Sequence, residues 1–263
     1  MLNFETSTLR IPVWLWPGGT GTPVLLVHGQ LWDHDVWLPT IERWAGRRPL
    51  ACFDLPGHGR APLPPDCTMS TLATSALEVL DALGWRKAVA IGHSLGAVTI
   101  LQASRRAPER FSACCHVGLP MPDVPAEMRA QFHAFGDGVQ SGFPPGLELE
   151  VRSMWYSASY QARHPELAGR IRALLEANDP CAAAAILHAV ADSPSTLPLP
   201  EPYAIRTWVI GMEEDAVVPL AAAAELVSAL RAEVVRLPGG HLVFDEQPEA
   251  LAATLDRFLD GCA

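Results

Sequence analysis

Residues 88–97 read Ala-Val-Ala-Ile-Gly-His-Ser-Leu-Gly-Ala, and they are the most informative stretch of this sequence. It begins with Ala88–Ile91, a short continuous apolar run of the kind found in strands that are covered on both faces. A Gly-x-Ser-x-Gly pattern follows, and a helical pattern begins directly after Ser94. Between a strand and a helix, this pattern is typical of a sharp turn that exposes a serine Oγ. Gly92 and Gly96 are required there because larger side chains would collide with the neighbouring strand and helix. We therefore predict that Ser94 is a nucleophile.

Apolar runs and helical patterns alternate along most of the chain. The other apolar runs are Val24–His28, Leu50–Phe53, Ala113–Val117, Thr207–Ile210 and the weaker Val234–Leu237. A 3.6-residue period occurs in Met69–Leu83, Leu95–Arg106, Leu220–Leu230 and Pro248–Leu259. A hairpin of Phe4–Leu9 and Ile11–Leu15 is expected before them. This alternation predicts an α/β fold with a mostly parallel, doubly wound sheet.

One stretch, from Pro120 to about Pro202, interrupts the alternation. Its helical segments are Ala126–Phe135, Leu147–Tyr160, Pro165–Ala177 and Cys181–Val190, separated by turns rich in Gly and Pro. The stretch follows the carboxyl end of a strand, which is where ligands bind in open α/β sheets. We therefore predict a core of residues 1–119 and 203–263 and a helical cap, or lid, of residues 120–202.

Composition narrows the choice of partners. The 263 residues carry a formal net charge of −10 and include a single lysine, Lys87, so a phosphate-binding groove for nucleic acid is not expected. No apolar run approaches the roughly 18–20 residues of a membrane span. The first ten residues lack the basic and apolar pattern of a signal peptide, so we expect a cytoplasmic protein without a membrane partner.

The sequence also gives no sign of a cofactor or a metal. The six cysteines lack CxxC or Cys/His ligand spacing, and we expect reduced thiols. No G-x-G-x-x-G follows the first apolar run, which argues against a nicotinamide or flavin. The histidines outside the motifs show no metal-ligand spacing, so we expect no metal site.

A serine nucleophile needs a base, and the base needs an acid that orients it. For this type of turn the chain order is Ser, then Asp or Glu, then His. His241 follows the last apolar run, and three acids, Glu213, Glu214 and Asp215, follow the run before it. Asp123, which lies after an earlier run, is a further candidate for the acid.

The arrangement resembles the α/β-hydrolase superfamily with a helical cap. Additional matching pieces are Leu26-Val27-His28-Gly29-Gln30, Asp54-Leu55-Pro56-Gly57-His58-Gly59 and the tail from His241 to Glu249. The resemblance covers nearly the whole chain, although the cap matches only in position and helical character. It implies that His28 and His58 lie in structural loops and make fixed hydrogen bonds there.

Carried over residue by residue, the resemblance makes Ser94 the nucleophile and His241 the base. Asp215 becomes the orienting acid because it stands four residues before a proline, as in the family's loop. The resemblance implies that the backbone N–H groups of Gln30 and Leu95 form the oxyanion hole. Gln30 departs from the apolar aromatic residue common at its position, so its side chain either binds the substrate or points to solvent.

The residue types in the motifs favour ester chemistry. Haloalkane dehalogenases and epoxide hydrolases of this superfamily use Asp where this chain has Ser94. Carbon–carbon bond hydrolases usually carry a His-Gly-x-Gly-Pro-Gly loop, which this chain lacks, and the low basic content provides no evident clamp for a phosphopantetheine phosphate. We expect a carboxylesterase or lactonase whose small-molecule substrate is a small to medium, mostly apolar ester or lactone. A thioesterase, acyltransferase or carbon–carbon bond hydrolase on the same triad, and a non-catalytic ligand-binding relative, are the alternatives.

The cap is expected to select the substrate and to leave the chemistry to the core. Its candidate wall residues are Phe132, Phe135, Phe143, Met154, Trp155 and Tyr156, of which Trp155 and Phe143 are the chosen substrate-binding residues. Helical spacing explains any one of them equally well as packing within the cap.

Overall fold

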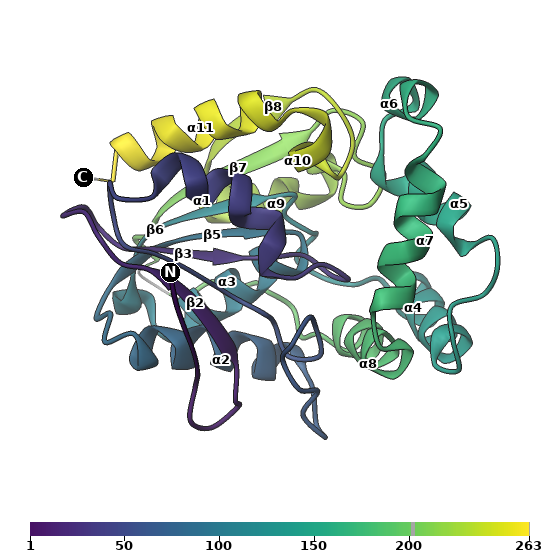
Figure 1. Ribbon diagram of the computed structural model, residues 1–263, viewed down its shortest axis with the longest axis horizontal. Helices are drawn as coiled ribbons and strands as arrows, with labels where there is room; N and C mark the ends of the chain where they lie inside the picture. The colour runs from purple at the N-terminus through teal and green to yellow at the C-terminus, as the bar shows by residue number, and fades with distance from the viewer. Residues whose placement is uncertain (201–202, 263) are drawn as a thin grey trace.

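Eight strands form one mostly parallel sheet in the computed structural model, which describes residues 1–200 and 203–262 (Figure 1). The strands are β1 (Leu2–Glu5), β2 (Pro12–Trp16), β3 (Val24–Val27), β4 (Leu50–Phe53), β5 (Ala88–His93), β6 (Phe111–Val117), β7 (Arg206–Met212) and β8 (Glu233–Leu237). Their order is β1-β2-β4-β3-β5-β6-β7-β8; β1 pairs antiparallel with β2, β2 pairs antiparallel with β4, and all other pairs are parallel. The predicted fold class is confirmed.

The apolar runs become central strands because both of their faces are covered. In β3, Leu25 and Val27 belong to one buried cluster, and Val24 and Leu26 belong to another on the opposite face. Successive side chains of a strand point to opposite faces, so a run without polar residues fits only a sheet that is covered twice.

Helices supply the two covers. The core helices are α1 (Leu38–Trp44), α2 (Met69–Ala82), α3 (Leu95–Arg106), α9 (Ala224–Ala229), α10 (Val243–Glu246) and α11 (Pro248–Asp260). Helices α2 and α3 pack into the cluster that contains Leu25, whereas α1 and α11 pack into the cluster that contains Leu26. Figure 1 shows the two pairs on opposite sides of the sheet. Helix α1 was not predicted, since it is only seven residues long.

Several predicted elements differ from the structure in their ends or their continuity. Strand β1 ends at Glu5 instead of Leu9, because Thr6 bonds to Ile11 through its backbone N–H and its Oγ1 and closes a turn. The segment expected as one helix from Leu220 begins as a 3₁₀ turn, Leu220–Ala223, before α9. The helix expected over residues 147–160 is two helices with a break between them, and the contacts of that break are described below.

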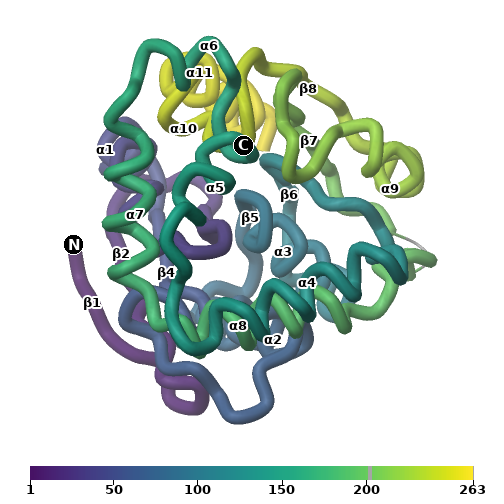
Figure 2. The backbone as a smooth tube through the Cα atoms, turned by 90° about the vertical axis from the view of Figure 1, so that its right-hand side faces the viewer, coloured from purple at the N-terminus to yellow at the C-terminus, as the bar shows by residue number. Residues whose placement is uncertain are grey.

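Five helices lie between β6 and β7. They are α4 (Ala126–Val139), α5 (Leu147–Trp155), α6 (Ala158–Arg163), α7 (Leu167–Ala177) and α8 (Pro180–Ala191), and they enclose a buried apolar cluster distinct from those of the sheet. In Figure 1 they stand at one end of the molecule, and in Figure 2 they face the viewer. The predicted cap boundary at residue 202, with Pro202, falls outside the described residues.

Two further observations concern the described part of the chain. Its six cysteines are free, as expected. Among its helices, none is both long enough and apolar enough to cross a membrane.

Candidate active site

The turn that carries Ser94 has the geometry expected from its sequence. Strand β5 ends at His93, helix α3 begins at Leu95, and Ser94 between them has φ 52° and ψ −115°. A Cβ on Gly96 would lie 2.3 Å from the carbonyl oxygen of Val27, and one on Gly92 would lie 2.5 Å from the backbone of Gly96. The prediction that side chains at these glycines would collide with their neighbours is confirmed.

Two hydrogen bonds connect Ser94 with His241 and Asp215. His241 Nε2 is 3.0 Å from Ser94 Oγ, and His241 Nδ1 is 2.8 Å from Asp215 Oδ2. With the Nδ1–H donating to the carboxylate, Nε2 is left to accept a hydrogen bond from the Ser94 hydroxyl. His241 follows β8, Asp215 follows β7 and Ser94 follows β5, so the carboxyl ends of three parallel strands bring them together.

Asp215 is held as an anion in a buried place. Its side chain is almost fully buried, and its Oδ1 accepts the N–H groups of Val217 and Val218, each at 2.9 Å. Burial alone would raise the pKa of the carboxyl, but the hydrogen bond from His241 and the two backbone donors outweigh it, so the pKa of Asp215 lies below its ordinary value.

The structure separates Asp215 from the competing acids. Glu213, Glu214 and Asp123 are exposed. Within the described residues, Asp215 is the acid that bonds to His241.

The resemblance implies two backbone N–H groups as oxyanion donors, those of Leu95 and Gln30. Leu95 is the first residue of α3, where the N–H groups of a helix lack intrahelical acceptors. Gln30 follows the His28-Gly29 turn and lines the same cavity as Ser94. Within residues 1–200 and 203–262, neither N–H donates to another protein group.

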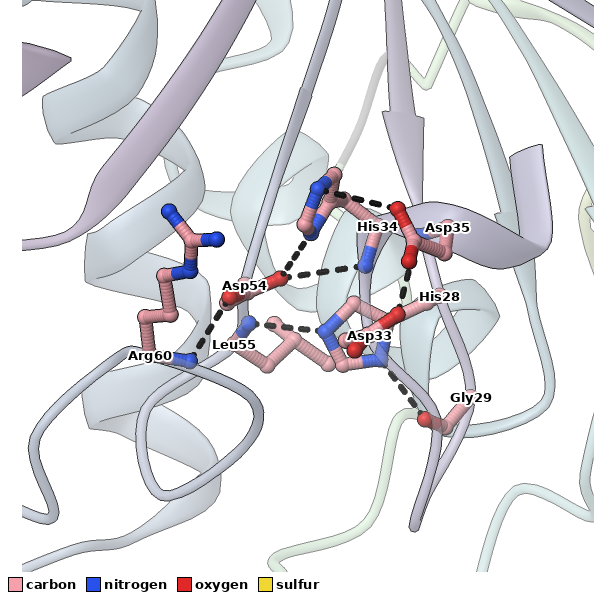
Figure 3. A network of polar contacts seen from close by, with 8 residues as sticks. All are labelled: His28, Gly29, Asp33, His34, Asp35, Asp54, Leu55 and Arg60. Carbon is pink, nitrogen blue, oxygen red and sulfur yellow. Dashed lines mark hydrogen bonds and ion pairs between the residues drawn. The ribbon is translucent and has the colours of Figure 1, made fainter. Parts of the chain in front are cut away.

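A buried polar network lies in the loops that follow β3 and β4 (Figure 3). His28 Nε2 accepts the N–H of Leu55 at 2.9 Å, and its Nδ1 donates to the carbonyl of Gly29 at 2.7 Å. The fully buried Asp54 accepts both the N–H and the Nδ1–H of His34, and its other oxygen accepts the N–H of Arg60. The network joins the loop after β3 to the loop after β4. The structural role expected of His28 is confirmed.

His93, beside Ser94, packs against His241. Its Nε2 donates to the carbonyl of His241 at 3.1 Å, and the two rings lie 4.7 Å apart between centroids. Burial, with a smaller contribution from His241, lowers the pKa of His93 to about 3, so its imidazole is neutral.

A cavity of about 350 Å³ opens beside Ser94 and His241. Five of the six candidate wall residues of the cap line it, namely Phe132, Phe135, Phe143, Met154 and Trp155. Tyr156 does not line it; this side chain is buried, and its hydroxyl donates to Asp245 at 2.7 Å. Further walls that were not predicted are Leu31, Trp32, Val139, Leu147, Val151, Leu175, Ala183, Leu187, Val217 and Leu242. Polar lining residues are few, and no lysine or arginine is among them.

In the described residues, one group of side chains lies close enough together to hold a metal ion. Ligand atoms of Asp33, His34 and Asp35 all lie within 4.8 Å of one another. These atoms are engaged in the polar network, since His34 bonds to Asp54 and Asp35, and Asp33 accepts the N–H of Asp35. The cluster therefore serves the loop structure.

Comparison with known proteins agrees with this geometry. The model of the Alpha/beta hydrolase family matches residues 24–254. The chain belongs to this family. The family match includes the turn at Ser94, both of its hydrogen-bonded partners and all the helices between β6 and β7.

Several solved structures share the fold of this α/β hydrolase. A thermophilic esterase from Thermogutta terrifontis superposes with a TM-score of 0.87 at 25% identity, over 99% of this chain and 98% of that one. An enol-lactonase from Burkholderia xenovorans superposes with a TM-score of 0.83 at 20% identity, over 97% and 100% of the two chains.

Curated relatives of the hydrolase match over shorter stretches. The dihydrolipoyllysine-residue acetyltransferase component of an acetoin cleaving system from Cupriavidus necator is 32% identical over 49% of this chain and 32% of its own length. A 3-oxoadipate enol-lactonase from Acinetobacter baylyi is 22% identical over 63% and 60%. The chain spans half or less of the length of several curated relatives that it matches.

Two residues that contact the site's loops in this hydrolase carry no clear signal in the sequence. Asn178, just after α7, donates from Nδ2 to the carbonyl of Leu31 at 2.9 Å, next to Gln30. Leu31 has a backbone φ of 66°, which residues other than glycine rarely adopt. Glu246 contacts the loop of His241; it belongs to the tail that matches the family pattern, but the pattern alone assigns it no role.

Proposed function

We propose that this α/β hydrolase cleaves a small to medium, uncharged and mostly apolar carboxylic ester or lactone through an acyl-serine intermediate. The observation that carries the proposal is the hydrogen-bonded series Ser94–His241–Asp215, whose serine opens onto an apolar cavity. A binding module would need the cavity but none of these three groups.

Acylation follows from the hydrogen bonds. Ser94 Oγ attacks the ester carbonyl carbon while His241 Nε2 takes the hydroxyl proton, and Asp215 stabilises the imidazolium that forms. The N–H groups of Gln30 and Leu95 receive the negative charge that develops on the carbonyl oxygen. His241 then returns the proton to the leaving alkoxide as its bond to the acyl carbon breaks; the alcohol of an ester departs, whereas that of a lactone stays attached to the acyl group as a hydroxyl.

Deacylation repeats these steps with water. His241 Nε2 takes a proton from the water as its oxygen attacks the acyl carbon, and it gives the proton back to Ser94 Oγ as the ester bond to serine breaks. The carboxylic acid leaves and the serine is regenerated.

The lining of the cavity supports an uncharged substrate. An ionised carboxylate that enters an apolar cavity loses its hydration, and this cost is large unless a cation compensates it. The lining residues include no lysine or arginine, while Glu150 lies among them. We therefore expect neutral esters to react faster than esters of equal length that end in a carboxylate.

Covalent labelling tests the proposal. A fluorophosphonate probe should label the wild-type protein and leave Ser94→Ala unlabelled. Ser94→Ala should also lower turnover of nitrophenyl esters by at least about a thousandfold with no change in melting temperature, because the hydroxyl acts chemically. Substrate identity follows from rates on a panel of neutral nitrophenyl esters, acid-ended esters and lactones.

Each outcome has a clear meaning. No labelling of the wild-type protein under any condition would indicate a binding protein. A Ser94→Ala variant that keeps more than a tenth of the wild-type rate would remove Ser94 from the mechanism. Labelling without turnover of any ester or lactone would refute the proposed substrate class.

A further inference from the structure

We propose that Glu246 is a positioning residue that joins the cap to the loop of His241, so that the cap holds the base in place. The inference rests on the proposed function of His241. Glu246 is the last residue of α10, five residues after His241, and its carboxylate is within hydrogen-bond distance of both the cap and the loop.

Three donors converge on the Glu246 carboxylate. Its Oε1 accepts the N–H of Gly240 at 2.9 Å and the N–H of Ser157 at 2.9 Å. Its Oε2 accepts the hydroxyl of Ser157. Gly240 directly precedes His241, and Ser157 lies in the break between α5 and α6 of the cap. One carboxylate therefore holds a cap residue and a neighbour of the base together, and hydrogen bonds to an ionised acceptor are the stronger kind.

A second bond attaches the other side of His241 to the same cap segment. The N–H of Leu242 donates to the carbonyl of Trp155 at 3.0 Å. Residues 240 and 242, which flank the base, are thus both tied to residues 155–157. These bonds also explain why α5 ends at Trp155, since its carbonyl is directed to the core rather than continuing the helix.

Gly240 permits this close approach. A Cβ at this position would lie 2.7 Å from the carbonyl oxygen of Trp155, 2.8 Å from the nitrogen of Ser157 and 2.9 Å from Oε1 of Glu246. The backbone φ of Gly240 is outside the left-handed region, so the requirement for glycine comes from these contacts. The cap segment and the base loop are packed backbone to backbone.

The neighbouring acid provides a natural contrast. Asp245 accepts the hydroxyl of Tyr156 at 2.7 Å and an Arg170 N–H at 3.3 Å. Both partners belong to the cap, and within the described residues the Asp245 carboxylate bonds to no residue flanking His241. Asp245 therefore tethers the cap, whereas Glu246 connects the cap with the base loop.

Turnover should depend on this connection. Without the bond from Gly240 to Glu246, the imidazole of His241 is no longer held within hydrogen-bond distance of Ser94 Oγ. Misplacing a catalytic group by about 1 Å can lower the rate roughly a hundredfold. Substrate binding in the apolar cavity should be little affected, because Glu246 is not among the lining residues. The expected signature is a loss in kcat with nearly constant KM.

The test compares Glu246→Ala with the matched variant Asp245→Ala on a small neutral acetate ester. Glu246→Ala should lower kcat roughly 10- to 100-fold, and Asp245→Ala should stay within about threefold of wild type. Glu246→Gln should restore most of the rate, because its amide oxygen accepts the two N–H groups and its amide nitrogen donates to the Ser157 hydroxyl. Gly240→Ala, whose Cβ would push the cap segment and the His241 loop apart, should reduce kcat in the same way. This variant replaces Glu246→Ala in the test if Glu246→Ala does not fold.

Melting temperatures and a substrate-free signal complete the design. Both alanine variants lose bonds between cap and core. If the role of Glu246 were purely structural, kcat would fall in both variants in proportion to the drop in melting temperature. That result, or an unchanged kcat in Glu246→Ala, would overturn the proposal. The proton NMR signal of the His241–Asp215 hydrogen bond should broaden in Glu246→Ala and persist in Asp245→Ala. A wild-type protein without esterase activity would refute the proposed function, while this signal would still decide the role of Glu246.

Discussion

Ser94 occupies a backbone conformation that the rest of the molecule must maintain. Its φ of 52° lies in a region that costs a residue other than glycine on the order of 1–3 kcal/mol. The N–H of Ser94 donates to the carbonyl of Val117 at 2.9 Å, so the next strand fixes the turn. The strain serves a purpose under the proposed function, because it presents Oγ to His241 instead of burying it in the sheet.

The residue-scale prediction concerns the acid. Asp215→Asn should lower kcat by roughly a hundred- to ten-thousandfold, because an amide favours the wrong tautomer of His241. The measurement is turnover of a neutral nitrophenyl ester at several pH values. Glu213→Gln and Glu214→Gln are the controls, and both should keep near wild-type rates since their side chains are exposed. A collapse in either control together with an active Asp215→Asn would contradict the assignment.

Among the elements, the cap helices have two roles, of which the sequence predicts only the first. They supply apolar walls of the cavity, as expected, but the break between α5 and α6 also bonds to the base loop. Trp155 takes part in both, because its ring lines the cavity and its carbonyl accepts from Leu242. Phe143 also lines the cavity, but it is only half-buried, so it contributes less than Trp155 to packing within the cap.

This difference predicts distinct behaviour for the two aromatic residues. Phe143→Ala should change the ranking of acyl chain lengths, with an effect of roughly 1–3 kcal/mol per methylene of lost contact, while acetate esters lose little. Trp155→Ala should shift the ranking and also lower the melting temperature, because removing a buried ring costs about 3–5 kcal/mol. Rates on a chain-length series beside melting curves test both. A uniform loss on every ester in Phe143→Ala would exclude it as a wall.

At the scale of the whole molecule, the core holds several neutral histidines. Burial, the largest cause at each site, lowers the pKa of His28 and His93 to about 3 and that of His58 and His116 to about 4. The unfolded chain binds these protons near pH 6.5, but the folded chain does not bind them until about pH 4 or below. Folding stability is therefore complete above about pH 6.5 and falls as the pH drops toward 4.

The prediction is a steep acid loss of stability between pH 6.5 and 4. Each buried histidine contributes up to about 1.4 kcal/mol per pH unit in this window. His116 is the best probe, because it lies in β6 and is not one of the three hydrogen-bonded groups Ser94, His241 and Asp215; its Nδ1 donates to the carbonyl of Ala97 at 3.0 Å. His116→Gln should reduce the slope of unfolding free energy against pH by about one bound proton in urea titrations. The solvent-accessible His164→Gln is the control, and an unchanged slope in His116→Gln would contradict the argument.

Much of the core could be predicted from local pattern. The run Leu50–Phe53 became a strand with the predicted ends, and the other apolar runs became strands whose ends differ by one or two residues, because only a doubly covered sheet accommodates them. Ser94, His241 and the group of acids that contains Asp215 could be located because each follows a strand's carboxyl end, whereas the choice of Asp215 over Glu213 and Glu214 came from the resemblance to the α/β-hydrolase superfamily. Local pattern misplaced the end of β1, which a turn closed by Thr6 and Ile11 sets, and it joined α5 to α6, between which the loop of His241 bonds to the chain.

Local sequence is enough to predict the alternation of strands and helices and the sharp turn at Ser94, because these depend on short-range periodicity and on the steric demands of glycine; the candidates for base and acid follow from the chain order that this type of turn requires. The packing of the cap on the core is what sets which cap side chains line the cavity, that Tyr156 bonds to Asp245, and that Ser157 and Gly240 both bond to Glu246. Those contacts join segments more than eighty residues apart. Their geometry follows from how the cap packs on the sheet, and no local pattern in either segment encodes it.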